Sequence, residues 1–172
     1  ADMGNTQDID RMINQAKDTF GRIDIMVNNA GVTRHADIMD LSEEDWDRIH
    51  RVNAKGVFFG MQRAAREMID QGTGGHIINI ASIAGKGYSG ASNVAYSASK
   101  GAVIAMTQLA AHQLGKHDIN VNAICPGITL TAIVAAGRAH HARTSEQSEE
   151  KWDEALNELI PIGRPNDPED VA

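Results

Sequence analysis

A tyrosine and a lysine stand four residues apart in the segment 96–100, which reads Tyr-Ser-Ala-Ser-Lys. The surrounding pattern predicts a helix, so the Tyr96 phenol and the Lys100 ammonium share one helical face. A nearby cation favours the phenolate and lowers the pKa of a phenol from its ordinary value of about 10. The pair is therefore suited to exchange a proton with a substrate near neutral pH. The alternative is a tyrosine at the edge of the core beside a solvated lysine.

Four further motifs accompany this pair in a set order. They are Asn28-Asn29-Ala30-Gly31 after an apolar run, Asn53 inside a helical pattern, Ser82 at the end of a strand pattern, and Pro126-Gly127 after a later strand pattern. In this order the chain resembles the short-chain dehydrogenase/reductase family. That family carries an Asn-Asn-Ala-Gly element, a catalytic Asn, a catalytic Ser, the Tyr-x-x-x-Lys pair and a Pro-Gly turn. The resemblance implies an NAD(P)-dependent oxidoreductase that interconverts a secondary alcohol and a ketone.

The resemblance also implies roles for the catalytic candidates. Tyr96 would move the proton while hydride passes between the substrate carbon and the nicotinamide, and Ser82 would hydrogen-bond the reacting oxygen. Lys100 would lower the Tyr96 pKa and bind the nicotinamide ribose, and Asn53 would hold a water beside Lys100 in a proton relay. Taken alone, Ser82 has the character of a turn or cap serine, and Asn53 that of an exposed or back-bonded asparagine.

The cofactor implied by the resemblance is NAD or NADP. Its adenosine ribose would lie over Asn29, Ala30 and Gly31, and its adenine beside Asp2 and Met3. Tyr96 and Lys100 would contact the nicotinamide riboside. The nicotinamide itself would meet a third group of residues, Pro126, Gly127, Thr129 and Thr131.

The family's Gly-x-x-x-Gly-x-Gly phosphate turn does not occur in these 172 residues. Its second strand, where a charged residue selects NAD or NADP, has no counterpart here either. We therefore expect residues 1–172 to form one Rossmann-like domain that is part of a longer polypeptide.

Composition excludes several other classes of protein. The net charge is −7 and aromatic residues make up 4%, which argues against a nucleic-acid surface. A single cysteine excludes an internal disulfide framework, and no apolar run approaches the roughly 20 residues of a membrane span. No His or Cys spacing matches a metal site. We expect a cytoplasmic enzyme acting on a small-molecule alcohol or ketone, and by family analogy a homo-oligomer, either tetramer or dimer.

The order of the elements predicts the fold class. Helices and strands alternate, which indicates an α/β fold with a doubly wound parallel sheet, and continuous Val and Ile in the strands predict helices on both faces in three layers. The resemblance implies that the run 86–93 lines a pocket and that the run 133–145 forms the mobile substrate lid of the family, with a solvated loop as the alternative. The expected helices are 9–20, 43 to about 70, 94–114 and 146–159, and the expected strands are 23–27, 76–81 and 119–125.

Two other classes of function remain open. One is a non-catalytic binding or scaffold protein with the same fold, which the missing phosphate turn favours and the intact catalytic residues oppose. The other is a lyase or epimerase of the same family.

Overall fold

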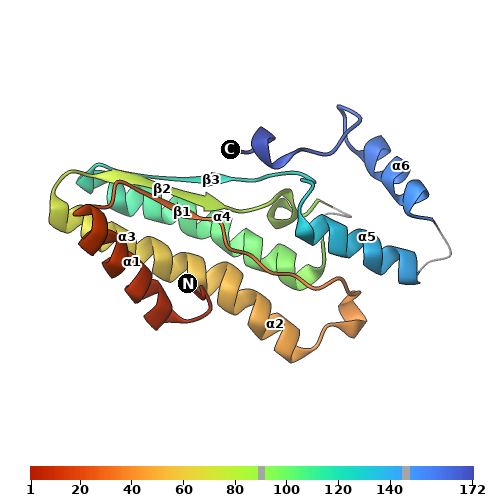
Figure 1. Ribbon diagram of the computed structural model, residues 1–172, viewed down its shortest axis with the longest axis horizontal. Helices are drawn as coiled ribbons and strands as arrows, with labels where there is room; N and C mark the ends of the chain where they lie inside the picture. Colours follow the sequence, from red (N-terminus) through yellow and green to blue (C-terminus); the bar gives the residue numbers. More distant parts are fainter. Residues whose placement is uncertain (89–91, 145–147) are drawn as a thin grey trace. The chain divides into compact units, whose positions relative to one another are not determined.

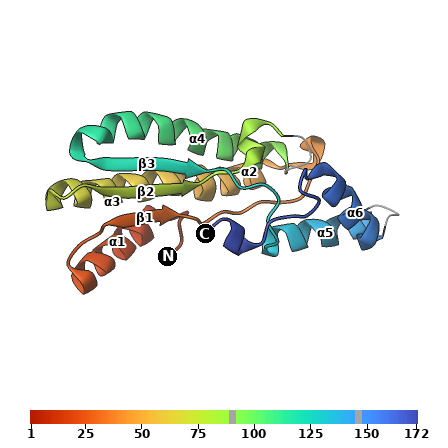
Figure 2. The ribbon, with the colours of Figure 1, turned by 90° about the horizontal axis from the view of Figure 1, so that it is seen from above.

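Three strands form a parallel sheet in the order β1-β2-β3. They are β1 (Ile25–Asn28), β2 (Gly75–Ile80) and β3 (Ile119–Ile124), with Val27 paired to Ile78 and Ile78 to Asn122. The computed structural model describes all residues except 89–91 and 145–147. All three strands run in the same direction (Figure 2), so their carboxyl ends meet at one edge of the sheet. That edge is where ligands bind in open parallel sheets.

The chain divides into two compact units, Ala1–Cys125 and Pro126–Ala172. The first contains the sheet and the helices α1 (Thr6–Phe20), α2 (Glu43–His50), α3 (Val57–Gln71) and α4 (Val94–Leu114). Helix α3 packs on β1 and β2, α4 packs mainly on β3, and α1 packs on α3. In the part of the chain that the structure describes, no helix is long and apolar enough to cross a membrane.

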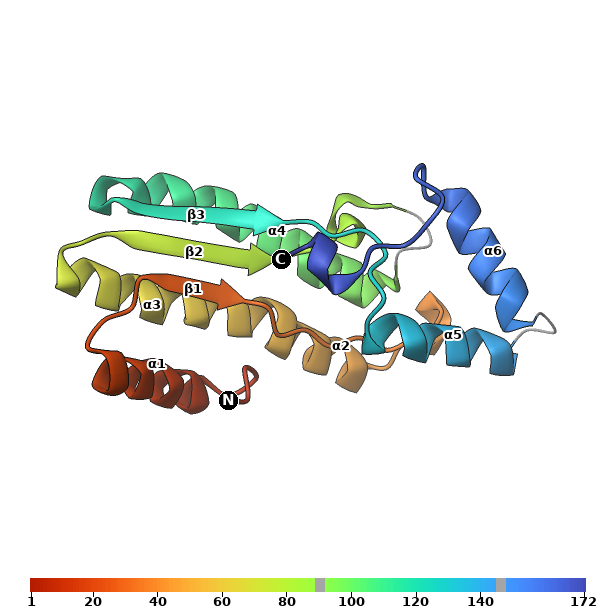
Figure 3. The same cartoon turned by 45° about the horizontal axis from the view of Figure 1, so that its top comes forward.

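The helices of the first unit all lie on one face of its sheet (Figures 1 and 3). Strand residues that point to this face, such as Met26, Ile77 and Val121, are buried. On the opposite face Ile25 is 60% exposed and Val27 50% exposed. The α/β class and the parallel sheet are thus confirmed. The second helical layer that the strand composition predicts is not found among the described residues of 1–125, so the strands alternate between buried and exposed positions.

The core lies between the sheet and these helices. Aliphatic and methionine side chains fill it, as expected for a sheet face covered by amphipathic helices. Its buried residues are Ile13, Ile23, Met26, Met61, Ala64, Ala65, Met68, Ile77, Ile119 and Val121.

Local sequence signals account for the helix ends. Ser42 and Asp45 form a reciprocal capping box at the start of α2, and Gly72 ends α3 in the left-handed conformation at φ 70°. The predicted helix from residue 43 to about 70 is therefore confirmed in extent. It contains a π-helical segment, Arg51–Gly56, between α2 and α3. Such π segments frequently occur at functional sites.

The second unit contains α5 (Ala132–Thr144) and α6 (Glu149–Leu159). The alternative of a solvated loop over 133–145 is wrong through residue 144, because alanine-rich sequence without proline favours a helix, while the lid stays a prediction. Residue 145, and residue 146 at the expected start of the last helix, lie outside the described residues. Helix α6 begins after Ser148, whose hydroxyl caps it by accepting from the Lys151 N–H.

A close backbone contact joins the end of β2 to α4. After β2 and Ser82 the chain forms a 3₁₀ turn, Ile83–Lys86, that packs on α4. A Cβ atom placed on Gly85 would lie 2.6 Å from the Lys100 carbonyl carbon and 2.7 Å from the Gly101 nitrogen. Only a residue without a Cβ permits this approach, so Gly85 sets the distance between the turn after Ser82 and the backbone of α4 at Lys100 and Gly101.

Substitution of Gly85 tests this contact. We expect Gly85→Ala to lower the free energy of unfolding by about 1 to 3 kcal/mol, because the new methyl group meets backbone atoms that cannot move aside cheaply. Gly101→Ala is the matched control, since its Cβ would meet the Gly85 oxygen at 3.4 Å and alanine favours the helix. Urea unfolding measures both. Equal stability of the two variants would show that the contact has no energetic consequence.

Candidate active site

Tyr96 and Lys100 lie on the first turns of α4, near the carboxyl end of β2. The Lys100 Nζ atom is 5.7 Å from the centre of the Tyr96 ring. It donates a hydrogen bond of 2.6 Å to the Ile80 carbonyl oxygen, and the residue is 3% exposed. The predicted sharing of one helical face by these two side chains is observed. The lysine is part of the buried site and is not a solvated neighbour.

Ser82 follows β2 and stands beside Tyr96. Its hydroxyl accepts a hydrogen bond of 3.1 Å from the Ala84 N–H, and so caps the 3₁₀ turn. The same side chain is hydrogen-bonded to the Tyr96 phenol. The cap role and the site role are therefore compatible in one residue.

Asn53 lies in the π-helical segment and is completely buried. Its Oδ1 atom accepts from the Val32 N–H at 2.8 Å, and its Nδ2 atom donates to the Val32 oxygen at 2.9 Å and the Ser99 Oγ at 3.1 Å. An exposed or back-bonded asparagine is thus excluded. The side chain instead joins this segment to the chain after β1 and to α4.

The turn after β1 lies next to these polar groups. Asn29 and Ala30 are exposed, while a Cβ atom on Gly31 would be 3.6 Å from Lys100 Nζ and 3.7 Å from Asn53 Oδ1. Gly31 therefore lies directly against the buried ammonium of Lys100 and the side-chain oxygen of Asn53. A hydroxylated group such as a ribose fits beside an exposed small-residue turn that faces an ammonium donor.

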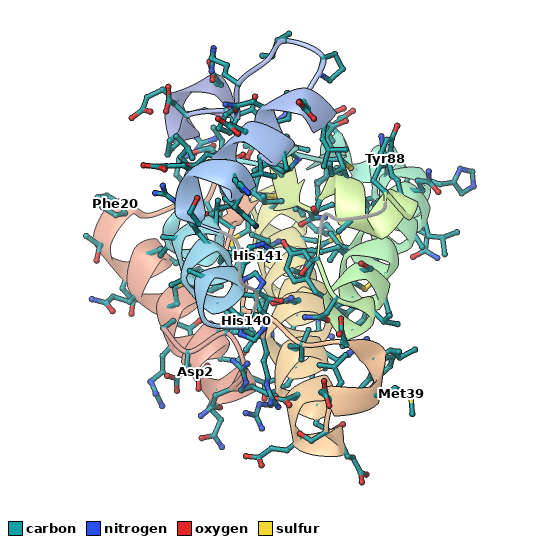
Figure 4. All side chains as sticks on the ribbon, turned by 90° about the vertical axis from the view of Figure 1, so that its right-hand side faces the viewer. Asp2, Phe20, Met39, Tyr88, His140 and His141 are labelled. Atoms are coloured by element: carbon teal, nitrogen blue, oxygen red, sulfur yellow. The ribbon has the colours of Figure 1, made fainter. Side chains whose placement is uncertain are left out.

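Asp2 and Met3 lie before α1, and their surroundings differ. Asp2 is exposed (Figure 4), and its carboxylate accepts from the Gly4 N–H at 2.8 Å. Met3 packs against the core, with its backbone oxygen in contact with the π-helical segment at Gly56. No hydrogen bond among the described residues joins Asp2 or Met3 to the four catalytic candidates, so their adenine contact stays a prediction.

The residues expected around the nicotinamide lie in the second unit. Thr129 pairs with Asn166 in an isolated parallel bridge, and its hydroxyl donates to the Gly127 oxygen at 3.3 Å. Thr131 stands directly before α5, and its carbonyl oxygen accepts from the Ala135 N–H. Pro126 begins the unit. The cofactor contacts of Pro126, Gly127, Thr129 and Thr131 remain predictions.

Burial controls the charge state of Lys100. Removal of the ammonium from water lowers its pKa to about 8, and the nearby Cys125 opposes part of this decrease. At neutral pH the side chain is therefore still mostly cationic.

Burial also controls Tyr96, in the direction opposite to our expectation. It raises the pKa of the phenol above its ordinary value, and the hydrogen bond from Ser82 offsets part of the increase. The predicted lowering of the Tyr96 pKa is wrong for the chain without a ligand. The reason is that desolvation penalises the phenolate more than the neighbouring groups stabilise it.

Sequence reasoning missed two side chains that hold the site together. Ser99 is completely buried, and its hydroxyl donates to the Tyr96 carbonyl oxygen at 2.7 Å. Asn93 caps α4 by accepting from the Tyr96 N–H at 2.8 Å. Both could have been found, since Ser99 follows Tyr96 at helical spacing and an asparagine just before a helix is a strong cap signal. In the run 86–93 that was expected to line a pocket, residues 89–91 lie outside the described part of the chain.

The family profile described as short chain dehydrogenase matches residues 1–142. The chain belongs to the short-chain dehydrogenase family. Two curated proteins and one solved structure illustrate the relationship. A 2-dehydro-3-deoxy-D-gluconate 5-dehydrogenase from Escherichia coli (strain K12) is 41% identical over 99% of this chain and 64% of its own length. A (3R)-3-hydroxyacyl-CoA dehydrogenase from Rattus norvegicus is 38% identical over 100% of this chain and 62% of its own.

A solved structure gives the same result for the fold of this chain. It is a variant actinorhodin polyketide ketoreductase with NADPH, and it matches with a TM-score of 0.91 and 31% identity. The match covers 99% of this chain and 66% of that one. The chain thus spans less than two thirds of the length of the curated relatives it matches.

The lowered pKa of Lys100 predicts a dependence of stability on pH. The folded chain loses the lysine proton near pH 8 and the unfolded chain near 10.5, so within this window the unfolded state binds more protons. Stability should therefore rise with pH there, by about 2 to 3 kcal/mol relative to Lys100→Met. Unfolding free energies of both proteins at several pH values measure the difference. If the unfolding free energies of the two proteins changed with pH in the same way, the buried placement of the Lys100 ammonium would be contradicted.

Proposed function

We propose that this chain carries the acid–base centre of an NAD(P)-dependent oxidoreductase that interconverts a secondary alcohol and a ketone. The observation that supports this most is the arrangement of Ser82, Tyr96 and Lys100. The Tyr96 phenol interacts with the Ser82 hydroxyl. The centre of the Tyr96 ring is 5.7 Å from the Nζ atom of the buried Lys100. The family membership of the chain supports the same reaction class.

Tyr96 is the proposed general acid and base. When a ketone is reduced, the phenol donates its proton to the carbonyl oxygen, and the raised pKa keeps the phenol protonated and ready at neutral pH. When an alcohol is oxidised, the phenolate accepts the hydroxyl proton, so this direction accelerates as pH rises. Ser82 is proposed to orient the reacting oxygen, because its hydroxyl interacts with the Tyr96 phenol and partly offsets the rise of the phenol pKa.

Lys100 and Asn53 are proposed to support Tyr96. The Lys100 ammonium uses one donor for the Ile80 carbonyl oxygen and has two left for a ribose hydroxyl and a water. Asn53 Oδ1 and Lys100 Nζ both lie next to Gly31, which supports a water held near these two groups in a proton relay. Asn53 also fixes the position of Val32 next to that turn.

The proposed cofactor is NAD or NADP, which supplies or accepts the hydride when bound. Asn29, Ala30 and Gly31 are proposed to lie under its adenosine ribose, which the exposure of Asn29 and Ala30 and the small side chains of this turn support. Asp2, Met3 and the residues Pro126, Gly127, Thr129 and Thr131 are proposed contacts on the strength of the family pattern. The ketoreductase with the same fold was solved with NADPH.

A cytoplasmic location and a homo-oligomeric assembly belong to this proposal. Large apolar side chains on the outward sides of the helices are consistent with a subunit interface, since Trp46 is 44%, Phe58 40% and Leu109 66% exposed. A single domain over residues 1–172 is also part of the proposal.

A test of the reaction class uses the full polypeptide that contains these residues. It is incubated with NAD⁺ or NADP⁺ and a panel of secondary alcohols, and the absorbance of reduced nicotinamide is followed. An increase supports the oxidoreductase. A lyase or epimerase would consume substrate without net absorbance, and a scaffold protein would give neither product nor calorimetric heat with the cofactor.

Tyr96→Phe tests the role of the phenol. We expect turnover to fall by about 10²- to 10⁴-fold, because the proton donor is removed while the ring still fills its site. The dissociation constant of the cofactor should stay within about threefold, since no contact to the cofactor other than the phenol is lost. Steady-state kinetics and calorimetry measure the two quantities.

The matched control is Tyr88→Phe, because Tyr88 is 63% exposed (Figure 4). It should leave turnover unchanged. Turnover of Tyr96→Phe within twofold of the unmodified protein would overturn the proposed role of the phenol.

A further inference from the structure

The backbone of Tyr96 is held at both of its polar atoms by side chains. Its N–H donates to Asn93 Oδ1 at 2.8 Å, and its carbonyl oxygen accepts from Ser99 Oγ at 2.7 Å. The first bond caps α4, as asparagine commonly does. The second is a local bond from a completely buried hydroxyl. The residue that carries the proposed proton donor is therefore more constrained than an ordinary residue in a first helical turn.

The other end of the Asn93 amide reaches a different part of the chain. Its Nδ2 atom donates to Thr33 Oγ1 at 3.0 Å and to the Arg34 carbonyl oxygen. Because Oδ1 must face the Tyr96 N–H donor, Nδ2 necessarily faces these two acceptors. The amide therefore ties the start of α4 to residues 33–34, which follow the exposed turn at Asn29–Gly31.

The same stretch of chain is also fixed from its other side. The Asn53 side chain binds both the N–H and the carbonyl oxygen of Val32. The Arg48 guanidinium donates to the Thr33 carbonyl oxygen at 3.1 Å. Asn53 in turn donates to Ser99, whose hydroxyl binds the Tyr96 carbonyl oxygen. These bonds form a closed ring.

The ring passes from Tyr96 through Asn93 to residues 33–34, along the chain to Val32, and back through Asn53 and Ser99. We define the 33–34 clamp as the two hydrogen bonds from Asn93 Nδ2, to Thr33 Oγ1 and to the Arg34 carbonyl oxygen, that close this ring.

We propose that Asn93 is a positioning residue, whose amide holds Tyr96 and the turn proposed to carry the cofactor in one frame through the 33–34 clamp. The inference rests on the proposed function, because a frame of this kind matters for a proton transfer beside a bound cofactor. A helix cap alone needs only the Oδ1 atom. The two bonds from Nδ2 go beyond capping, and they join segments that are about 60 residues apart in the sequence.

Asn93→Ser separates the cap from the clamp. Serine is a good N-cap, but its hydroxyl lies too close to the backbone to reach residues 33–34 as well. We expect kcat to fall about tenfold in the full polypeptide, since small misplacements of catalytic groups are costly. The cofactor dissociation constant should stay within about threefold and the unfolding midpoint within a few degrees. Asn93→Ala, which loses both functions, should also lower the unfolding midpoint.

Two further variants sharpen the test. Thr33→Ala removes one acceptor of the clamp, and its effect on kcat in combination with Asn93→Ser should be smaller than the product of the single effects. Ser97→Ala is the matched control, because Ser97 donates to the Asn93 carbonyl oxygen at 2.9 Å and takes no part in the ring. We expect it to retain full kcat.

Hydrogen exchange gives a readout that does not need turnover. In Asn93→Ser the amide of Val32 should exchange at least about tenfold faster, while the capped amide of Tyr96 keeps its protection. If the unmodified protein shows no turnover, the proposed function fails, and the exchange at Val32 alone decides whether the clamp exists. Unchanged exchange at Val32 would overturn the inference. So would an unchanged kcat in an active protein, or a loss of kcat that only follows a loss of folding stability.

Discussion

The packing of α4 against the end of β2 is the constraint on which the site depends. Gly85 brings the backbone after Ser82 into contact with the backbone at Lys100 and Gly101. The Lys100 ammonium is buried at the same place and donates to the Ile80 carbonyl oxygen. One strand end and one helix therefore fix Ser82, Tyr96 and Lys100 relative to each other. The π-helical segment adds Asn53 from a second helix, so the site combines residues far apart in sequence without any long loop carrying them.

Burial shifts both central groups of the site toward their neutral forms, although Lys100 stays mostly cationic at neutral pH. Burial raises the pKa of Tyr96 and lowers that of Lys100 to about 8. The chain by itself therefore provides a protonated phenol, which suits donation to a carbonyl oxygen. Removal of a proton from an alcohol needs additional positive charge near the phenol, and the oxidised nicotinamide ring would supply it. In this account the direction of catalysis is tied to the redox state of the cofactor.

Much of this could be predicted from the sequence, for identifiable reasons. Helix α4 is predicted at 94–114 and lies at Val94–Leu114, because its sequence is rich in alanine and contains no proline. The π-helical segment could not be predicted, since it depends on hydrogen bonds from Asn53 to Val32 that form only in the folded chain. The pKa of Tyr96 was predicted in the wrong direction, because residue spacing reports a nearby cation but not the depth of burial. The roles of Ser99 and Asn93 were missed for a different reason, since these side chains bind the backbone of Tyr96 and not its reacting phenol.

The most direct test of this account is the titration of Tyr96 itself, measured as the difference in tyrosinate absorbance between the unmodified polypeptide and Tyr96→Phe. Without cofactor, we predict a pKa above the ordinary value for a tyrosine, because burial dominates. With the oxidised dinucleotide bound, we predict a pKa below that value, because the ring adds positive charge beside the phenol. The reduced dinucleotide should not cause this decrease. A Tyr96 pKa that is the same in all three states would contradict the account.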